Sequence, residues 1–258
     1  TYSGGTVLGA NAGLLVASNV TSIGSGGISI GAGSEFLVRM PGSVTFTNVI
    51  TGLGTARFDV FGAAAASITL SNSTLAAFNG TVIVTNSSGS PTGNKLAGTD
   101  ILATNTTLII SAGNTFYQGA RSNEFGLVLL GGAGNNELRG ALRIGGGTHF
   151  KGNISLTENA TIGGTPTVEF TGNINTAAPG TNTLSFGAPS ENAMTANLSG
   201  VLSDGVGVLA LARALGGNAV VLLNSNSYSG LTTVSNGIIR VANNFGLGST
   251  NNGVLVPA

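Results

Sequence analysis

The stretch that decides the fold is "FKGNISLTENATIGGTPTVEFTG", residues 150 to 172. It opens and closes on a phenylalanine, any residue and a glycine, and the first of these triplets is followed by the strict polar–apolar alternation "NISL". Alternation with a period of two over so few residues is typical of a short β-strand with one buried face. The glycine in front of it indicates a sharp corner.

The same pattern, a ring or a leucine followed by any residue and then glycine, recurs along the chain. Its copies are mostly about 12 to 30 residues apart, which is the scale of one strand or one full coil in a solenoid. They begin at Tyr2, Phe78, Leu138, Phe150, Phe170, Leu198 and Tyr228, with a looser version at Tyr117. Clusters of Gly, Asn and Ser between the copies indicate corners, and "NSSGSPTGNK", residues 86–95, is predicted to be a loop projecting from one coil.

Composition separates this fold from its alternatives. Only 7% of the residues are charged and 5% are aromatic, there is no Trp, and glycine numbers 43. A disordered chain would be more charged, and a β-sandwich usually places large aromatic residues in its core and charges on its outer face. A narrow coil is filled instead by Val, Ile, Leu and Ala with an occasional Phe. We therefore expect one all-β domain over residues 1–258, a parallel β-helix of about 11 to 12 coils.

The charge balance and the residue types exclude several classes of protein. Nine basic and nine acidic residues cancel, so no broad field would attract nucleic acid or an anionic membrane surface. No apolar run approaches the roughly 20 residues of a membrane-spanning helix; the longest, residues 208–223, is interrupted by Arg213 and Gly216. The chain has no cysteine, which excludes a disulfide scaffold and thiolate metal sites.

The two ends of the chain carry nearly the same phrase. Residues 1–19 read "TYSGGTVLGANAGLLVASN", and residues 226–244 read "NSYSGLTTVSNGIIRVANN". The longer segment 196–249, which contains the second phrase, resembles the autotransporter-associated β-strand repeat of bacterial exported passenger proteins. A lysine typical of that repeat is absent, and Arg213 follows the apolar residues 208–211 instead. The resemblance implies a right-handed β-helix that is secreted or displayed on a bacterial cell surface, and it does not imply a catalytic site.

The repeated phrase also suggests how the ends are used. Each coil of a β-helix pairs with the coils before and after it at a spacing of about 4.8 Å, so a terminal coil leaves a row of unpaired N–H and C=O groups. Neither end phrase is a charged or proline-rich cap of the kind that solenoids usually carry. We therefore expect each end to continue into another coil, of the same longer chain or of the next subunit in a head-to-tail homopolymer. The residues expected to make this contact are Tyr2, Val7, Leu8, Val254, Leu255 and Val256.

The most charged part of the chain is "ELRGALRIGGGTHFKGNISLTENATIGGTPTVEF", residues 137–170. If one coil takes about 20 residues, these charges line adjacent coils. They are then either solvated ion pairs on an outer face or a face that binds a glycan or a matrix protein. The candidates are Glu137, Arg139, Arg143, His149, Lys151, Glu158 and Glu169.

Residues that catalysis or metal binding would need are sparse. His149 is the single histidine, which excludes a zinc site with two histidines. Asp59, Asp100 and Asp204 are isolated in the sequence, whereas glycan-active β-helices generally need clustered carboxylates. "GGAGNNELR", residues 131–139, resembles a calcium-binding nonapeptide, but Asn136 replaces the aspartate and no tandem copy follows. We predict no catalytic residue, no metal site and no cofactor.

The sequence therefore favours a non-enzymatic extracellular structural protein, a β-helical filament or stalk subunit that associates end to end. One alternative is the shaft of an autotransporter-type adhesin that binds a host, matrix or glycan partner. A second alternative is a glycan-active β-helix enzyme.

Overall fold

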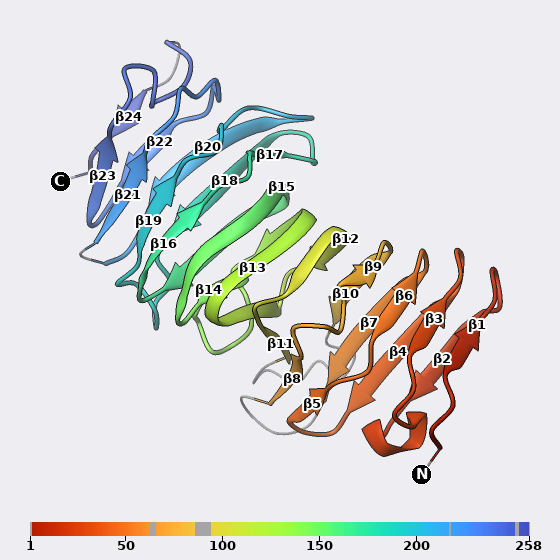
Figure 1. The fold of residues 1–258 in the computed structure, drawn as a ribbon. Coiled ribbons are helices and arrows are strands. Elements are labelled where there is room, and N and C mark those ends of the chain that lie inside the picture. Colours follow the sequence, from red (N-terminus) through yellow and green to blue (C-terminus); the bar gives the residue numbers. More distant parts are fainter. Residues whose placement is uncertain (1, 62–65, 86–93, 217, 251–252, 258) are drawn as a thin grey trace.

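Short strands joined by tight corners wind the chain into a parallel β-solenoid of about ten turns (Figure 1). The computed structural model describes residues 2–61, 66–85, 94–216, 218–250 and 253–257, so most of the loop predicted at residues 86–95 lies outside the described residues. Within them, the one helical segment is the short 3₁₀ turn η1 (Val20–Ile23), and no helix there is long and apolar enough to cross a membrane. The predicted parallel β-helix is confirmed.

Three ladders of parallel strands run along the solenoid, and each coil contributes to them in turn. The first ladder contains β1 (Thr6–Leu8), β3 (Ile28–Ile30), β6 (Ile50–Gly52), β9 (Ala77–Phe78), β16 (Thr167–Phe170), β19 (Thr195–Leu198), β21 (Ala219–Leu222) and β23 (Ile238–Val241). The second contains β2 (Leu14–Ala17), β4 (Glu35–Met40), β7 (Thr55–Val60), β10 (Thr81–Thr85) and β17 (Ile174–Thr176). The third contains β5 (Val44–Phe46), β8 (Ser67–Leu70), β11 (Asn94–Thr99), β14 (Leu142–Ile144), β18 (Thr181–Phe186), β20 (Val208–Arg213), β22 (Thr232–Val234) and β24 (Val254–Leu255).

Long strands in the middle of the solenoid pass around its corners and join more than one ladder. They are β12 (Leu102–Ile110), β13 (Asn114–Gly132) and β15 (Gly147–Gly164). The first part of β13 pairs with β14 in the third ladder, and its last part pairs with β15 in the second. The pairing of β13 with β15 shifts register at three places, which lets the strand bend without leaving the ladder.

The length of one coil varies along the chain. Phe150 pairs with Phe170, which is 20 positions later, whereas Thr55 pairs with Thr81, which is 26 positions later. The longer coils are one reason why about ten turns form where the sequence suggested about 11 to 12. Side chains that are neighbours on the surface can therefore be separated by a variable distance in the sequence.

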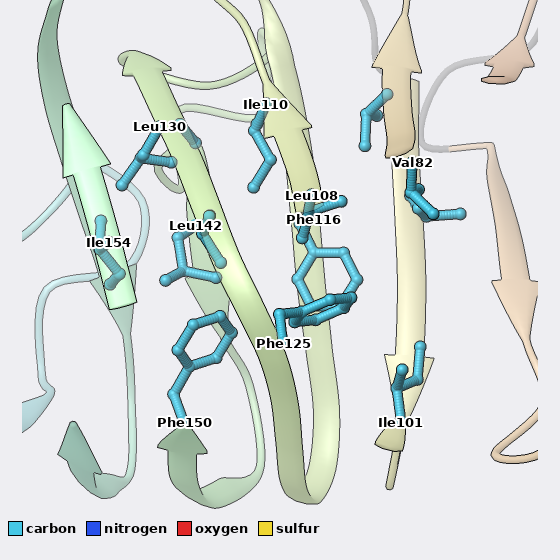
Figure 2. Close-up of a cluster of buried hydrophobic side chains, with 14 of the residues drawn as sticks. Val82, Ile101, Leu108, Ile110, Phe116, Phe125, Leu130, Leu142, Phe150 and Ile154 are labelled. Carbon is cyan, nitrogen blue, oxygen red and sulfur yellow. The ribbon is translucent and has the colours of Figure 1, made fainter. Parts of the chain in front are cut away.

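Phenylalanine fills the interior more regularly than the composition suggested. Nine of the 11 phenylalanines are fully buried, namely Phe36, Phe46, Phe58, Phe78, Phe116, Phe125, Phe150, Phe170 and Phe186. Five of them form one continuous stack from Phe116 to Phe186, with ring centroids 5.4 to 6.3 Å apart. Figure 2 shows the first three rings of this stack, Phe116, Phe125 and Phe150, among aliphatic side chains such as Leu142 and Ile154. Burying one such side chain stabilises a fold by about 1.5 to 3 kcal/mol.

The glycine that follows these rings is required by the stacking of coils. A Cβ added at Gly172 would lie 1.8 Å from the carbonyl oxygen of Gly152, and one added at Gly200 would lie 1.9 Å from that of Gly172. Successive corners thus sit directly on top of one another, with no room for a side chain between them. Close approach, rather than a positive φ, explains the repeated glycine at Gly172 and Gly200, because a positive φ is found at Gly152 but not at these two.

Candidate functional site

The structure divides the charged candidates among three places. Glu137 and Arg139 lie between β13 and β14, and Arg143 lies in β14, so these three face outward from the third ladder. His149 and Lys151 of β15 and Glu169 of β16 lie on the first ladder. Glu158 is exposed in β15 between its second-ladder and third-ladder parts. The seven residues therefore do not form one continuous face.

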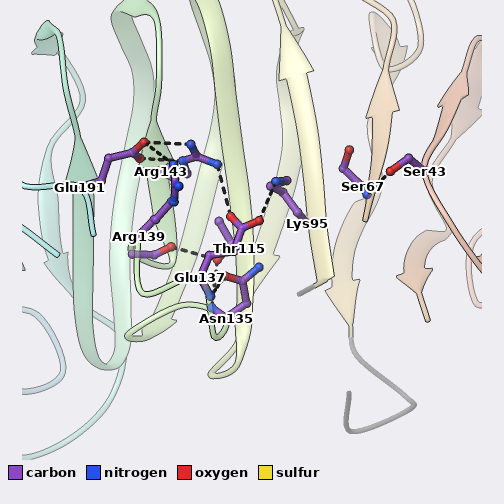
Figure 3. A network of polar contacts seen from close by, with 10 residues as sticks. Ser43, Ser67, Lys95, Thr115, Asn135, Glu137, Arg139, Arg143 and Glu191 are labelled. Carbon is purple, nitrogen blue, oxygen red and sulfur yellow. Dashed lines mark hydrogen bonds and ion pairs between the residues drawn. The ribbon is translucent and has the colours of Figure 1, made fainter. Parts of the chain in front are cut away.

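The group on the third ladder belongs to a larger ion-pair network (Figure 3). Glu137 lies 2.9 Å from Lys95 Nζ and 3.3 Å from Arg143 Nη1. Arg143 also donates to both oxygens of Glu191, at 2.6 and 2.8 Å, and Arg139 Nη1 lies 3.0 Å from the same carboxylate. The side chains of Lys95, Glu137, Arg143 and Glu191 are only 7 to 13% exposed. This set of five residues is called the network below.

An aromatic ring packs against the cations of the network. The Arg143 guanidinium lies 4.4 Å and the Lys95 ammonium 5.7 Å from the ring centroid of Tyr117. Burial by itself lowers the pKa of Arg143, but its hydrogen bonds to Glu191 and the charges of Glu191 and Glu137 outweigh burial and raise that pKa above its ordinary value. The arginine is therefore held in its charged form with its donors directed at carboxylates. The arrangement favours a set of fixed ion pairs that hold neighbouring coils together over a chemically reactive group.

Sequence reasoning missed Lys95 and Glu191 as members of the network and Tyr117 as the ring that packs against it. Lys95 is 42 positions before Glu137 and Glu191 is 48 positions after Arg143. The signal that could have found them is the coil length, since residues one or two coils apart share a face. That length varies, so the sequence alone could not select these partners.

The candidates on the first ladder form more open ion pairs. His149 Nε2 lies 3.4 Å from Glu169, and Lys151 Nζ lies 3.8 Å from Glu124, with 35 to 44% of each side chain exposed. Such pairs contribute roughly 0 to 1 kcal/mol each because water screens them. The hydroxyl of Ser199 donates to Glu169 at 3.0 Å, so the carboxylate lies between the serine and the histidine. In a nucleophilic triad the imidazole occupies that middle position.

Metal-ligating side chains do not gather in the part of the chain that the structure describes. No group of three or more His, Cys, Asp or Glu residues there is close enough to hold an ion. Asn136 lies in the loop that carries Glu137 and Arg139. The neighbouring Asn135 is buried and accepts a hydrogen bond from the Glu137 N–H, as expected for a side chain that shapes a turn.

Both terminal coils expose apolar side chains. In the described ladders β1 pairs only with β3, β2 only with β4, β23 only with β21 and β24 only with β22. Each of these four strands therefore has one unpaired edge, and the two pairs of edges lie at opposite ends of the solenoid (Figure 1). Exposed apolar residues at the first end are Val7, Leu14, Leu15 and Val16, and those at the second are Ile238, Val241, Phe245, Val254, Leu255 and Val256.

The second end is also hollowed. A cavity of about 330 Å³ opens there, lined by Thr232, Val234, Gly237, Ile238, Ile239, Val241, Leu247, Val254 and Val256. Apart from the threonine hydroxyl, its side chains are apolar. Each interior coil covers the core of the coil before it, and the hollow lies where the last described coil has no such cover.

The predicted contact residues mostly occupy these two ends. Val7 is 78% exposed, Val256 is 68% exposed, and Tyr2, Val254 and Leu255 are about half exposed. Leu8 differs, because it points inward and only 8% of it is exposed. The sequence reasoning did not select the exposed residues of β2 and β23, whose strands "LLVA" and "IIRV" lack a clear alternation.

No family model, curated protein or solved structure matches this chain. The fold and the geometry of the terminal coils are therefore the basis on which a function can be argued. The resemblance to the autotransporter-associated repeat stays a prediction.

Proposed function

We propose that the protein is a non-enzymatic extracellular structural protein, a β-solenoid filament or stalk subunit whose terminal coils associate end to end. The observation that carries the proposal is the pair of apolar end coils, whose unpaired strand edges a further coil would cover, either of the next subunit or of adjoining segments of a longer chain. Such edges are templates for another strand, and exposed apolar surface next to them favours association because burial removes it from water. Secretion to a bacterial cell surface is part of the proposal, and it rests on the resemblance of residues 196–249 to the autotransporter-associated β-strand repeat.

The side walls of the solenoid support the same proposal by contrast. In the first ladder the outward position of Val7 is taken by Ser29 and Thr51 in the next two coils. In the third ladder the outward position of Leu255 is taken by Thr233 and Ala212 in the two coils before it. At these two ladder positions the interior coils thus carry small or polar side chains and the terminal coils carry large apolar ones, while other apolar residues are exposed on the walls at Leu53, Leu102, Leu138 and Val206.

The state of the carboxylates supports a role other than catalysis. Of the nine acidic residues, seven form ion pairs with a basic side chain: Glu35, Asp59, Asp100, Glu124, Glu137, Glu169 and Glu191. An eighth, Asp204, accepts hydrogen bonds from Ser229 and Leu209, which lower its pKa although burial acts to raise it. Acid–base catalysis on a glycan generally needs two facing carboxylates with different pKa values, and these carboxylates are engaged elsewhere.

The proposal is tested by light scattering over a concentration series together with negative-stain electron microscopy of the full chain. We expect filaments with an axial repeat of about 50 Å, since about ten turns stack at about 4.8 Å each. Discrete short rods that stay monomeric at every concentration would overturn end-to-end association. That result would favour the adhesin-shaft alternative, to be followed by screening glycans and matrix proteins against residues 137–170.

A proline at the second end should block association and leave the fold intact. Thr232 N–H points to the following coil, where it donates to the Gly253 carbonyl at 3.1 Å. Its partner Val254 therefore directs its own N–H away from β22, toward any coil that is added. We expect Val254→Pro or Val256→Pro to abolish filaments because proline removes a ladder donor, with unchanged circular dichroism. The control is the side-wall substitution Val206→Lys. Val206 is 70% exposed and lies away from both ends, so this substitution should leave the filaments unaltered.

A further inference from the structure

A row of apolar side chains runs along the outer side of the second ladder. Ile83 of β10 pairs with Ile109 of β12, and Ile109 pairs with Leu129 of β13. All three side chains are half-buried, and they point outward because the residues before and after each of them are buried. In the row beside them, Leu127 is also half-buried and pairs with Thr107. Ile83, Ile109, Leu127 and Leu129 are called the wall patch below.

The wall patch lies on interior coils of the solenoid. The strand β10 has β7 on one side and β12 on the other, and β13 is followed by β15. The patch is therefore independent of the open edges of the first and last coils. A sheet face that meets only water usually carries polar residues at its outward positions. Large aliphatic residues in register on three successive strands are typical of a face that packs against another sheet.

Polar side chains flank the wall patch along the solenoid, and the two flanks differ in charge. On one side Arg57 pairs with Ile83 in the ladder and donates to both oxygens of Glu35, at 2.7 and 3.0 Å. On the other side Ser155 follows Leu129. Its hydroxyl donates to Asn175 Oδ1 in the next coil at 2.6 Å. One flank is thus an ion pair, and the other is uncharged.

We propose that the second ladder packs face to face against the second ladder of another copy of this chain, with the two solenoids antiparallel and a two-fold axis at Ile109. Ile109 then faces Ile109 of the other copy, and Ile83 faces Leu129 of the other copy. Facing sheets lie about 10 Å apart, so outward side chains interdigitate between them. This lateral contact goes beyond the end-to-end association proposed above and does not depend on it, because it uses a different surface.

Charge selects a second copy in the antiparallel orientation. The two-fold axis places the charged flank of each copy on the uncharged flank of the other, with Arg57 against Ser155 and Glu35 against Asn173. Asn173 is exposed, and its Oδ1 already accepts from the Val201 N–H at 3.0 Å, so its amide N–H groups are the ones left to meet a carboxylate. A parallel pair in the same register would instead place Arg57 on Arg57, and like charges that face each other disfavour a contact.

The size of the face fits a second copy as well. From β4 to β17 the second ladder has seven rungs, which span about 35 Å at about 4.8 Å each, and the outward residues cover about 20 Å across. The contact would then cover about 700 Å² per copy, which is close to the roughly 800 Å² per partner of a standard specific interface. One surface serves both partners, as a two-fold contact requires.

Thiol cross-linking of full-length chains tests the position of the two-fold axis. The chain has no native cysteine, so Ile109→Cys introduces a single thiol. Facing sheets are too far apart for a direct disulfide, and a short bis-maleimide bridges that gap. We expect Ile109→Cys alone to give a covalent dimer on a denaturing gel. The matched control is Leu102→Cys, in the same strand but in its first-ladder part and 53% exposed, which should stay monomeric.

A second pair of cysteines tests the orientation. Leu37 and Asn175 lie three rungs from Ile109 on opposite sides. In the antiparallel pair they face each other, so an equimolar mixture of Leu37→Cys and Asn175→Cys should cross-link, and each variant alone should not. Cross-linking of Leu37→Cys alone would show parallel solenoids and would overturn the proposed arrangement.

A charge in the wall patch tests its contribution to affinity. Analytical ultracentrifugation is carried out in the Val254→Pro background, where end-to-end association is blocked. We expect Ile109→Lys to weaken dimerisation by more than about a hundredfold, because two like charges would face each other in a desolvated contact. Leu102→Lys should change it by less than about threefold. Circular dichroism confirms that both variants fold.

The two proposals fail in distinguishable ways. Monomeric Val254→Pro chains together with no cross-link of Ile109→Cys would overturn the lateral contact, and filaments of the wild type would still support end-to-end association. Equal dimerisation of Ile109→Lys and Leu102→Lys would also overturn it. Cross-linked Ile109→Cys dimers from a wild type that forms no filaments would support the lateral contact and contradict the proposed function.

Discussion

At the scale of single residues, Arg213 is the most unusual side chain in the fold. It is the largest fully buried side chain, with 1% exposed, and burial lowers the pKa of its guanidinium. Arginine nevertheless stays charged at neutral pH. Its donors reach the carbonyls of Phe186 at 2.8 Å, Asn192 at 3.1 Å and Asn218 at 3.2 Å. It thus ties together three segments of successive coils, which explains why an arginine stands inside an otherwise apolar ladder.

Replacing this arginine should destabilise the fold. Arg213→Met keeps much of the apolar stem but leaves three carbonyls without their donor, so we expect the free energy of unfolding to fall by about 2 to 4 kcal/mol. Urea denaturation followed by circular dichroism measures the change. Lys151→Met is the matched control, because Lys151 lies on the surface in a long ion pair, and it should shift stability by less than about 0.5 kcal/mol. Equal shifts in the two variants would contradict this role for Arg213.

At the scale of the structural element, the coil corner sets what the sequence may contain. The Gly152, Gly172 and Gly200 corners stack so closely that a Cβ would meet the carbonyl of the previous corner. The rings before them, such as Phe150 and Phe170, fill the interior directly inside these corners. One short motif therefore specifies both the bend of the chain and the packing beneath it.

A methyl group at a stacked corner should be harmful, and one at an open corner should not. Gly172→Ala places Cβ 1.8 Å from the Gly152 oxygen, and we expect a loss of about 1 to 3 kcal/mol as the coils separate to relieve the clash. Gly42 has no atom within 4 Å of such a Cβ, so Gly42→Ala should be neutral or slightly stabilising. Thermal unfolding of both variants measures the difference. Similar melting temperatures would indicate that the corners tolerate side chains and that close approach is not the reason for the repeated glycine.

At the scale of the whole molecule, the positive and negative charges balance, and most of the charged side chains form ion pairs with one another. The formal net charge is zero, and the network joins charges that come from different coils. The terminal coils, in contrast, present mainly apolar side chains. If these ends associate as proposed, the attraction is hydrophobic and has little long-range electrostatic component.

Salt should therefore affect association according to its type. Raising sodium chloride from about 50 to about 500 mM should change the association constant by less than about threefold, because exposed charges contribute little to the contact. Sodium sulfate should strengthen association, since it is excluded from apolar surface. Light scattering in the two salts measures both effects. A loss of tenfold or more in sodium chloride would point to a contact made by ion pairs and would contradict the apolar ends as its basis.

The sequence identified some of the candidate surfaces and missed others for a common reason. It located the apolar ends at Tyr2, Val7 and Val254–Val256, because terminal strands are read from the local pattern. It misplaced Leu8, whose side chain points into the interior. It also could not select Glu191 as the partner of Arg143 or Lys95 as the partner of Glu137. Those partners depend on the length of each coil, which is 20 residues from Phe150 to its partner Phe170 and 26 residues from Thr55 to its partner Thr81.

The sequence by itself determined the parallel coil, the corner glycines and the lack of a broad charged field, because alternation, close-packed glycine and net charge are local or additive properties. Only the tertiary structure decided which charges meet in the network, which ladder each copy of the end phrase occupies, and where the core is left open. Those features depend on where each coil places its corners and on how many strands separate two residues, because coils of 20 and of 26 residues both return the chain to the same ladder.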